Sequence, residues 1–274
     1  MSSRTIIVLG MGRSGTSAVA DVLRRLGVYW GPENLMMAPQ IDNPRGFWEF
    51  IPFYEINVEL MRRLGGHWHR PPSLGAGWER SAELDDLRSK AIDIVQNCFR
   101  VPLWGFKDPR CCLTLPFWRT VIPNPIECVI PIRNPLEVAA SLEHREKLPF
   151  SRGLGLWIAY VTWAWQASLT LRRIVVSYDR ILADPGKEIS RLEGFLRVDS
   201  SSSLLSNAIS GIHQELRHER ADLGEALSNP EVPEIAKELY RALQSLSRDE
   251  PADIGQFMGR AMEFSDSIAS CSSS

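Results

Sequence analysis

Gly10-Met11-Gly12-Arg13-Ser14-Gly15-Thr16-Ser17 follows an apolar run, Thr5–Leu9, and precedes a helical pattern of apolar residues that ends near Leu26. A strand, a glycine-rich turn and a helix start form an anion site, because backbone N–H groups surround a phosphate and the helix dipole favours negative charge. Two glycines have the spacing of a Walker A loop, but Thr16 replaces its lysine and a cation stands inside the loop at Arg13. The stretch therefore predicts a phosphate-binding loop that differs from those of ATP- and GTP-binding proteins.

The composition is that of a globular protein: 274 residues, of which 44% are hydrophobic and 23% charged. A net charge of −2 argues against a large nucleic-acid-binding surface. Because the first strand signal begins at Thr5, we expect no signal peptide, and we expect the five cysteines to be reduced thiols. These features favour a cytoplasmic protein.

Four apolar runs read as strands of a buried parallel sheet, and helical patterns lie between them. These runs are Ile6–Leu9, Leu103–Phe106, Cys128–Ile132 and Ile174–Ser177. The expected fold is α/β, a three-layer P-loop-like arrangement of a central parallel sheet flanked by helices. Residues 153–171 carry no charge, and their Thr, Gln and Ser side chains favour a buried core helix over a membrane span.

The chain divides into a core at 1–200, a helical C-terminal extension packed on the core at 201–264, and a disordered tail at 265–274. Residues 28–75 form a Pro-, Gly- and Trp-rich excursion from the first strand–helix unit, with one expected helix at Phe53–Leu64. Long irregular loops on a rigid sheet usually carry substrate contacts, so we place the acceptor side there.

A second anion site is predicted where the third strand ends at Arg133. Asn134 has the position of a helix cap, Pro135 that of the first helical residue, and Glu137 that of the acid in a capping box. Arg133 therefore emerges beside a helix start, and Ser141 lies on the same helical face as Asn134. Both side chains are expected to reach one phosphate.

Two anion sites on strand ends, the first without the Walker lysine, resemble the sulfotransferases that use 3′-phosphoadenosine-5′-phosphosulfate (PAPS). Residues 13–17 resemble their 5′-phosphosulfate loop, and Arg133 with Ser141 has the spacing of their 3′-phosphate motif. Further segments resemble a Lys-x-Pro element of the carbohydrate-type members, a segment of bacterial members, and the strand and loop that follow the 3′-phosphate motif: these are residues 105–110, 43–49 and 175–185. The resemblance covers residues 4–200.

Two family features are missing. The cytosolic small-molecule branch has Lys-Thr-His on the second motif strand, with His as the base, whereas this chain has Lys107-Asp108-Pro109. The late Arg-Lys-Gly motif that closes the 3′-phosphate site in that branch is also absent, and Arg217 or Arg220 are candidates to replace it.

The resemblance implies a role for each motif residue. The donor nucleotide would bind the loop and the second anion site, that is Gly12, Arg13, Ser14, Gly15, Thr16, Ser17, Arg133 and Ser141. Lys107 would stabilise charge on the bridging oxygen and Glu49 would take the acceptor proton, with Asp108 and His69 as alternatives. Trp48 and Trp68 are candidates to stack on a flat acceptor. No metal site is expected, because the adjacent Cys111 and Cys112 have poor ligand spacing.

The function predicted from the sequence is sulfuryl transfer from PAPS, without a metal, to a hydroxyl of a glycan or of another small-molecule or lipid-linked acceptor. A P-loop kinase that uses ATP–Mg²⁺ is the alternative, but it requires the missing loop lysine and an acid where Arg133 stands. A nucleotide-binding protein without catalysis is a third reading. We expect no nucleic-acid partner and no integral membrane span, and the oligomeric state, including a homo-oligomer, stays open.

Overall fold

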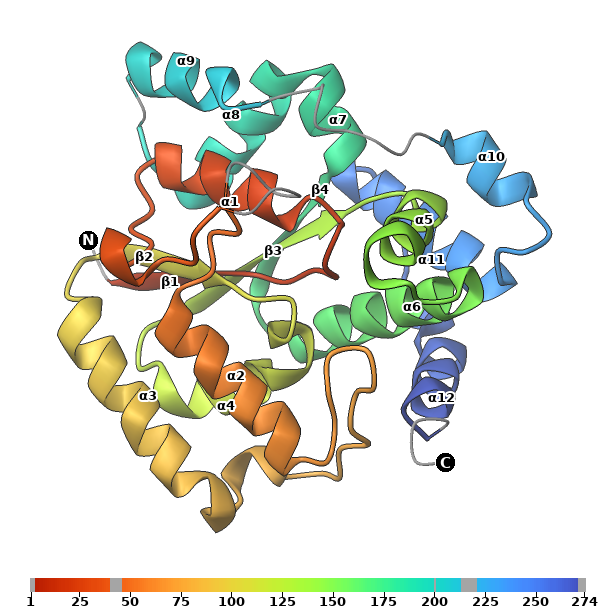
Figure 1. The fold of residues 1–274 in the computed structure, drawn as a ribbon. Helices are drawn as coiled ribbons and strands as arrows, with labels where there is room; N and C mark the ends of the chain where they lie inside the picture. The colour runs from red at the N-terminus through yellow and green to blue at the C-terminus, as the bar shows by residue number, and fades with distance from the viewer. Residues whose placement is uncertain (1–2, 40–45, 200, 213–220, 271–274) are drawn as a thin grey trace.

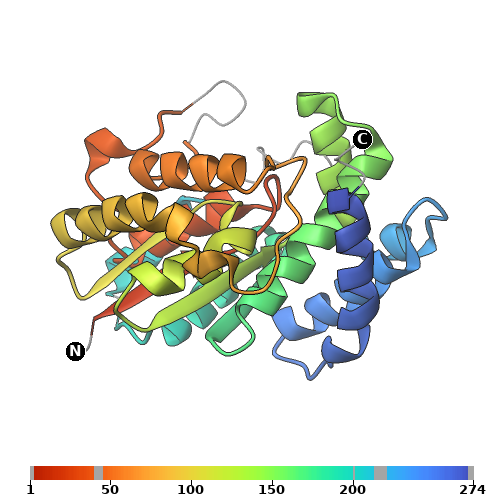
Figure 2. The ribbon, with the colours of Figure 1, turned by 90° about the horizontal axis from the view of Figure 1, so that it is seen from below.

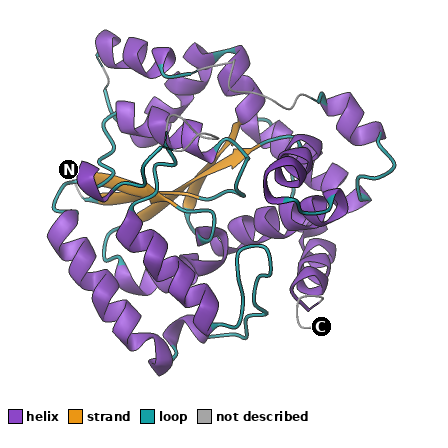
Figure 3. Ribbon diagram, in the orientation of Figure 1, coloured by secondary structure: helices purple, strands orange, loops and turns teal. Residues whose placement is uncertain are grey.

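A computed structural model describes residues 3–39, 46–199, 201–212 and 221–270. Its centre is a parallel sheet of four strands in the order β2-β1-β3-β4. The strands are β1 (Arg4–Val8), β2 (Leu103–Lys107), β3 (Ile126–Ile132) and β4 (Arg172–Ser177). All four predicted strands are present, and helices surround the sheet (Figure 3). The predicted α/β class is confirmed.

Helices cover both faces of the sheet (Figure 1). Ile6 and Val8 of β1 pack with one layer and Ile7 with the other, because successive side chains of a strand point to opposite faces. The first layer is α1 (Thr16–Arg25), α7 (Tyr178–Ala183), α8 (Pro185–Leu196) and α9 (Ser202–Ser210). The second contains α2 (Ile51–Arg63), α3 (Asp85–Cys98), α4 (Cys111–Val121) and α6 (Phe150–Ala167).

The strand order places a topological switch point at β1. The chain runs from β1 to β2 on one side of β1 and then crosses to β3 on its other side, and Val8 pairs with both Lys107 and Val129. The last residues of neighbouring strands therefore meet at one edge of the sheet. Ligands of open parallel sheets bind at the carboxyl ends of the strands beside such a point, which is where the loop 10–17 lies.

The uncharged run at 153–171 forms most of α6, as predicted, although the helix ends at Ala167. A Cβ atom on Gly155 would lie 2.6 Å from Cδ1 of Ile268, so glycine permits α6 and the C-terminal helix to touch. In the described parts of the chain, no helix combines the length and apolarity that a membrane span needs.

The C-terminal region is helical: α10 (Leu223–Ser228), α11 (Glu234–Ser247) and α12 (Gly255–Ser270). Helix α12 packs against α6, and α11 against β4 (Figure 2). The sequence predicted a disordered tail from residue 265, but α12 continues to Ser270. Phe264 and Ile268 lie one turn apart and pack on the core, so apolar contact outweighs the serine-rich composition.

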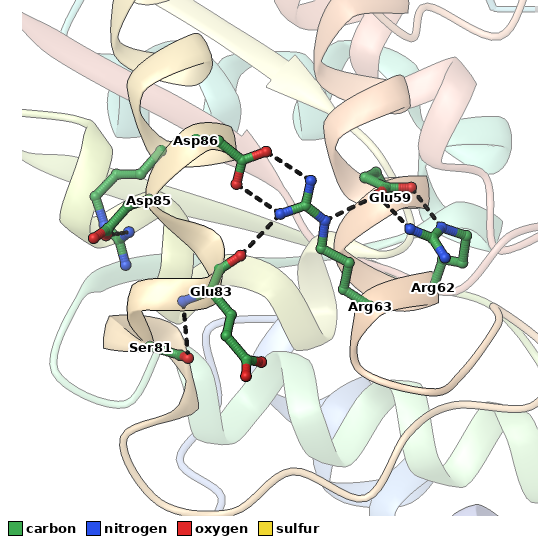
Figure 4. Close-up of polar contacts among 8 residues, drawn as sticks. Glu59, Arg62, Arg63, Ser81, Glu83, Asp85 and Asp86 are labelled. Carbon is green, nitrogen blue, oxygen red and sulfur yellow. Dashed lines mark hydrogen bonds and ion pairs between the residues drawn. The ribbon is translucent and has the colours of Figure 1, made fainter.

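The excursion holds more structure than the predicted single helix. Besides α2 it contains a 3₁₀ turn, η1 (Glu33–Leu35), and an isolated bridge between Met36 and Phe50. After it come η2 (Trp78–Arg80) and η3 (Ala82–Leu84). Arg63 joins the end of α2 to α3: its guanidinium binds the Glu59 and Asp86 carboxylates and the Glu83 carbonyl oxygen (Figure 4).

Candidate active site

The donor loop, residues 10–17, connects β1 to α1. Arg13 and Gly15 have positive φ angles of 72° and 82°. A Cβ atom on Gly15 would lie 2.3 Å from Cδ2 of Tyr178, so only glycine fits this position. Gly15 also caps α1, whose first turn has no acidic residue, and it has no side chain to accept from the N–H groups there. The loop therefore presents backbone donors and the positive end of the helix dipole.

The second anion site lies beside the donor loop, where α5 (Pro135–Glu146) follows β3. The Asn134 side chain accepts from the Leu136 N–H at 3.0 Å, which confirms the predicted cap. Arg133 donates to the Arg13 carbonyl oxygen at 3.1 Å, and Arg13 Nε donates to Ser141 Oγ at 2.9 Å. The structure thus brings the two predicted phosphate sites into direct contact.

Arg133 is buried and already has an anionic neighbour. Its Nε donates to Glu137 Oε2 at 2.6 Å, and its guanidinium lies 4.9 Å from the centre of the Tyr178 ring. Glu137 also accepts from the Ala221 N–H at 2.9 Å. The carboxylate that the sequence suggests for a capping box therefore binds the arginine and the segment before α10. The proposed closing residues Arg217 and Arg220 lie outside the described residues.

The two predicted catalytic side chains form a buried ion pair. Lys107 is the last residue of β2, and its Nζ lies 2.8 Å from Glu49 Oε1. Their side chains are only 3% and 9% exposed. Glu49 belongs to the excursion, and its backbone is fixed there because its carbonyl oxygen accepts from the Met37 N–H at 2.8 Å. The structure therefore joins residues that are far apart in the sequence.

The alternative bases are engaged elsewhere. Asp108 is 1% exposed, and it accepts from Asn57 Nδ2 and from the N–H and guanidinium of Arg110. His69 Nδ1 lies 3.2 Å from His67 Nδ1, and burial lowers the pKa of both imidazoles. Asp108 is thus fixed as a structural acceptor, and the histidines are paired with each other.

One cavity of about 280 Å³ connects the donor loop with the ion pair. Its lining includes six of the predicted donor-binding and catalytic residues: Gly12, Arg13, Thr16, Ser17, Glu49 and Lys107. Ser14 and Gly15 belong to the same loop but not to the lining, and Arg133 and Ser141 lie behind Arg13. The arrangement can hold an anion at the loop and a proton acceptor opposite it.

Four aromatic side chains also line the cavity. They are Phe47, Tyr54, Trp68 and Tyr160. The Tyr160 hydroxyl donates to the Trp68 carbonyl oxygen at 2.7 Å, and burial raises its pKa, so it stays protonated. Trp68 lines the cavity, whereas the Trp48 ring lies 4.6 Å from the Arg24 guanidinium and does not belong to the lining.

Sequence reasoning missed Arg110, Tyr54 and Tyr160 as cavity residues. The sequence signal that could have identified Arg110 is its position, three residues after Lys107. Nothing local marks the tyrosines, because helices that are distant in the sequence bring them together. In the described residues no group of three or more His, Cys, Asp or Glu side chains is placed to hold a metal ion.

No protein-family model and no curated protein sequence matches the chain. Solved structures do resemble it. The sulfotransferase domain of the Synechococcus PCC 7002 olefin synthase has 16% identity and a TM-score of 0.51, over 98% of this chain and 95% of that one. The sulfotransferase domain of the curacin biosynthetic pathway has 14% identity and a TM-score of 0.48, over 96% and 97%. A retinol dehydratase solved with retinol and PAP has 14% identity and a TM-score of 0.42, over 98% and 82%.

Proposed function

We propose that this protein, whose fold is that of a sulfotransferase domain, transfers the sulfuryl group of PAPS to an acceptor hydroxyl. The observation that carries the proposal is the single cavity in which a glycine-rich anion loop faces the Glu49–Lys107 pair. Sulfuryl transfer, like phosphoryl transfer, is catalysed mainly by positioning and by charge stabilisation. The cavity supplies both.

In the proposed reaction the acceptor oxygen attacks sulfur, the bond from sulfur to the 5′-phosphate oxygen breaks, and PAP leaves. Glu49 takes the hydroxyl proton. Lys107 binds Glu49 through one N–H and has two further donors for the bridging oxygen that gains charge. Arg13 and the backbone of Ser14–Ser17 hold the 5′-phosphosulfate, and the helix dipole of α1 adds to the field.

Arg133 and Ser141 are proposed to bind the 3′-phosphate. Both contact Arg13, so a phosphate there lies next to the donor loop. The phosphate would share Arg133 with Glu137, and it would compete with Arg13 for the Ser141 hydroxyl. This arrangement supports a preference for 3′-phosphorylated nucleotides.

The acceptor is proposed to enter along the excursion and to be a glycan or another small-molecule or lipid-linked alcohol. The kinase reading is less well supported: Thr16 stands where the Walker lysine belongs, and β3 leads into Arg133 rather than into an acid. The thiols of Cys98, Cys111, Cys112 and Cys128 are unpaired, which suits a reducing compartment such as the cytoplasm.

Thermal denaturation with nucleotides tests the donor. At about 100 times Kd a ligand stabilises the native state by about 2.7 kcal/mol, which raises Tm by about 5–10 °C for a protein of this size. We expect this shift with PAP and PAPS, a much smaller one with AMP, which lacks the 3′-phosphate, and none with ATP–Mg²⁺. A shift with ATP–Mg²⁺ alone would favour the kinase. Incubation with PAPS and an acceptor panel, followed by mass spectrometry for sulfate esters, then tests the transfer.

A further inference from the structure

Arg110 is a rigid cation in the cavity wall that the proposed chemistry does not use. It stands between Lys107 and α4, and its side chain is only 13% exposed. Nη1 of Arg110 donates to Asp108 Oδ1 at 3.0 Å, and the guanidinium lies 4.7 Å from the centre of the Tyr54 ring. An ion pair on one side and a ring on one face fix the orientation of the guanidinium.

The opposite edge of this guanidinium, formed by Nε and Nη2, donates to no side chain or carbonyl group within the described residues. Arg110 has five N–H donors, and the Nη1 contact with Asp108 is the only side-chain hydrogen bond that it donates there. Neither Nε nor Nη2 is buried without a partner, and Arg110 lines the cavity. The edge formed by Nε and Nη2 matches the two oxygens of an oxyanion.

The side chains that hold Arg110 come from outside the donor loop. The aromatic neighbour Tyr54 comes from α2 in the excursion, and Tyr160, which lines the same cavity, comes from α6. The cavity lining has four cationic side chains, Arg13, Lys107, Arg110 and Arg145, against two acidic ones, Glu49 and Glu146. With Arg13 assigned to the donor and Lys107 paired with Glu49, two lining cations remain. Arg145 lies beside Glu146 and 5.5 Å from the centre of the Phe47 ring, whereas Arg110 is fixed by Asp108 and by Tyr54 of the excursion, on the acceptor side.

We infer that the acceptor carries an oxyanion, a carboxylate or a phosphate, which binds the Nε–Nη2 edge of Arg110 while the hydroxyl of the same molecule meets Glu49. The inference rests on the proposed function and narrows its acceptor to acidic hydroxyl compounds. The Tyr54, Trp68 and Tyr160 side chains would pack on the body of the molecule between the two groups. A neutral analogue loses the charge-assisted pair and leaves Arg110 without its ligand.

A binding experiment on the full chain saturated with PAP tests this without turnover. Calorimetric titration compares 4-hydroxyphenylacetate with its uncharged amide, and 4-hydroxybenzyl phosphate with 4-hydroxybenzyl alcohol. Hydrogen bonds to charged groups contribute about 1.5–3 kcal/mol, so we expect each anion to bind about 10- to 100-fold more tightly than its neutral partner. The pair with the larger ratio identifies the oxyanion.

Variants assign the preference to Arg110. Arg110→Gln is expected to abolish it, and Arg110→Lys, which keeps the charge but loses the fork, to retain part of it. Arg62→Gln, on the exposed side of α2, is the matched control and keeps the wild-type ratio. Should Arg110→Gln fail to fold, Arg110→Lys still gives the comparison.

Three results would overturn the inference: equal binding of anion and neutral partner, no binding of either anion, or a preference that survives Arg110→Gln and is lost in Arg145→Gln. Failure of the proposed function looks different. A chain that does not bind PAP contradicts the donor assignment, whereas one that binds PAP and shows no anion preference contradicts the role of Arg110 alone.

Discussion

Replacing Glu49 by glutamine is the sharpest perturbation of the proposed chemistry. The substitution removes the charge and basicity of a carboxylate whose Oε1 lies 2.8 Å from Lys107 Nζ, and it keeps the size and one oxygen acceptor. Loss of a general base typically lowers the rate about 100- to 10,000-fold, which corresponds to about 2.7–5.5 kcal/mol of barrier. We therefore expect kcat of Glu49→Gln to fall by that factor.

The Glu49→Gln substitution also lowers the stability of the fold, and an upper bound for this loss can be given. Removing one charge from a buried pair costs about 3–5 kcal/mol when the other charge is left without compensation. Here the glutamine oxygen still accepts from Lys107, and the cavity admits water. We therefore expect the free energy of unfolding to fall by about 2 kcal/mol. That loss lowers Tm by about 4–8 °C, and the double variant Glu49→Gln/Lys107→Met should recover part of it, because no buried charge remains unpaired.

The assay must separate catalysis from folding and from nucleotide binding. Steady-state transfer from PAPS gives kcat, calorimetry gives the Kd of PAP, and both are measured well below the Tm of the variant. The Kd of PAP should change less than about threefold, because Glu49 faces the acceptor. Glu55→Gln, an exposed glutamate on α2, is the control and should match wild type.

The outcome of two variants decides the assignment. Normal kcat in Glu49→Gln would refute its role as the base. If Asp108→Asn were then inactive at normal stability, the base would be Asp108, although its bonds to Arg110 and Asn57 argue against this. A large rise in the Kd of PAP would place Glu49 at the nucleotide instead.

Other expectations follow from the same structure. Arg133→Ala should remove most of the preference for PAP over AMP in calorimetry, and a variant that keeps this preference would contradict the 3′-phosphate assignment. Transfer should persist in EDTA, since the proposal assigns charge stabilisation to Lys107 and Arg13; loss of activity that Mg²⁺ restores would favour a kinase. Hydrogen bonds from Arg62 and Arg63 lower the pKa of Glu59 to about 2. Because this folded-state pKa lies below the ordinary value near 4.5, the stability it contributes is present above pH 4.5 and declines as the pH falls towards 2; a carboxyl-carbon NMR titration checks the pKa.

Sequence patterns predicted the parts of the fold that depend on local order. The four strands, the cap at Asn134 and the buried helix α6 each follow from residues that are adjacent in the chain. The end of the chain did not follow, because helix α12 forms through the contact of Phe264 and Ile268 with the core. The serine-rich composition predicted disorder there, because composition carries no information on long-range packing.

The candidate site was predictable to a similar extent. The resemblance to sulfotransferase motifs selected Glu49, Lys107, Arg13 and Ser141, and the structure places these residues in two contacting pairs. Arg110 could not be given a role, because its fixed edge exists only when α2 supplies Tyr54 and the turn after β2 supplies Asp108. A sequence identifies a cation, but folding determines which of its donors are used.

This distinction changes how the charges of the site act. In the sequence, Lys107 and Arg133 are cations whose predicted ligands are the bridging oxygen and the 3′-phosphate of the nucleotide. In the fold each is already paired, with Glu49 and Glu137, so each pair is close to neutral before the nucleotide binds. Attraction of the donor would then rest on Arg13, on the backbone donors of the loop and on the dipole of α1. The paired carboxylates have a different consequence: under the proposed function Glu49 would be held where the hydroxyl proton is transferred, and Glu137 binds the guanidinium of Arg133 beside the loop. Neutralising Glu137 should thus leave a more mobile Arg133, and the preference for PAP over AMP should weaken in Glu137→Gln even though the site gains positive charge. A preference that instead rises with that added charge would show that Arg133 acts by simple attraction and needs no such support.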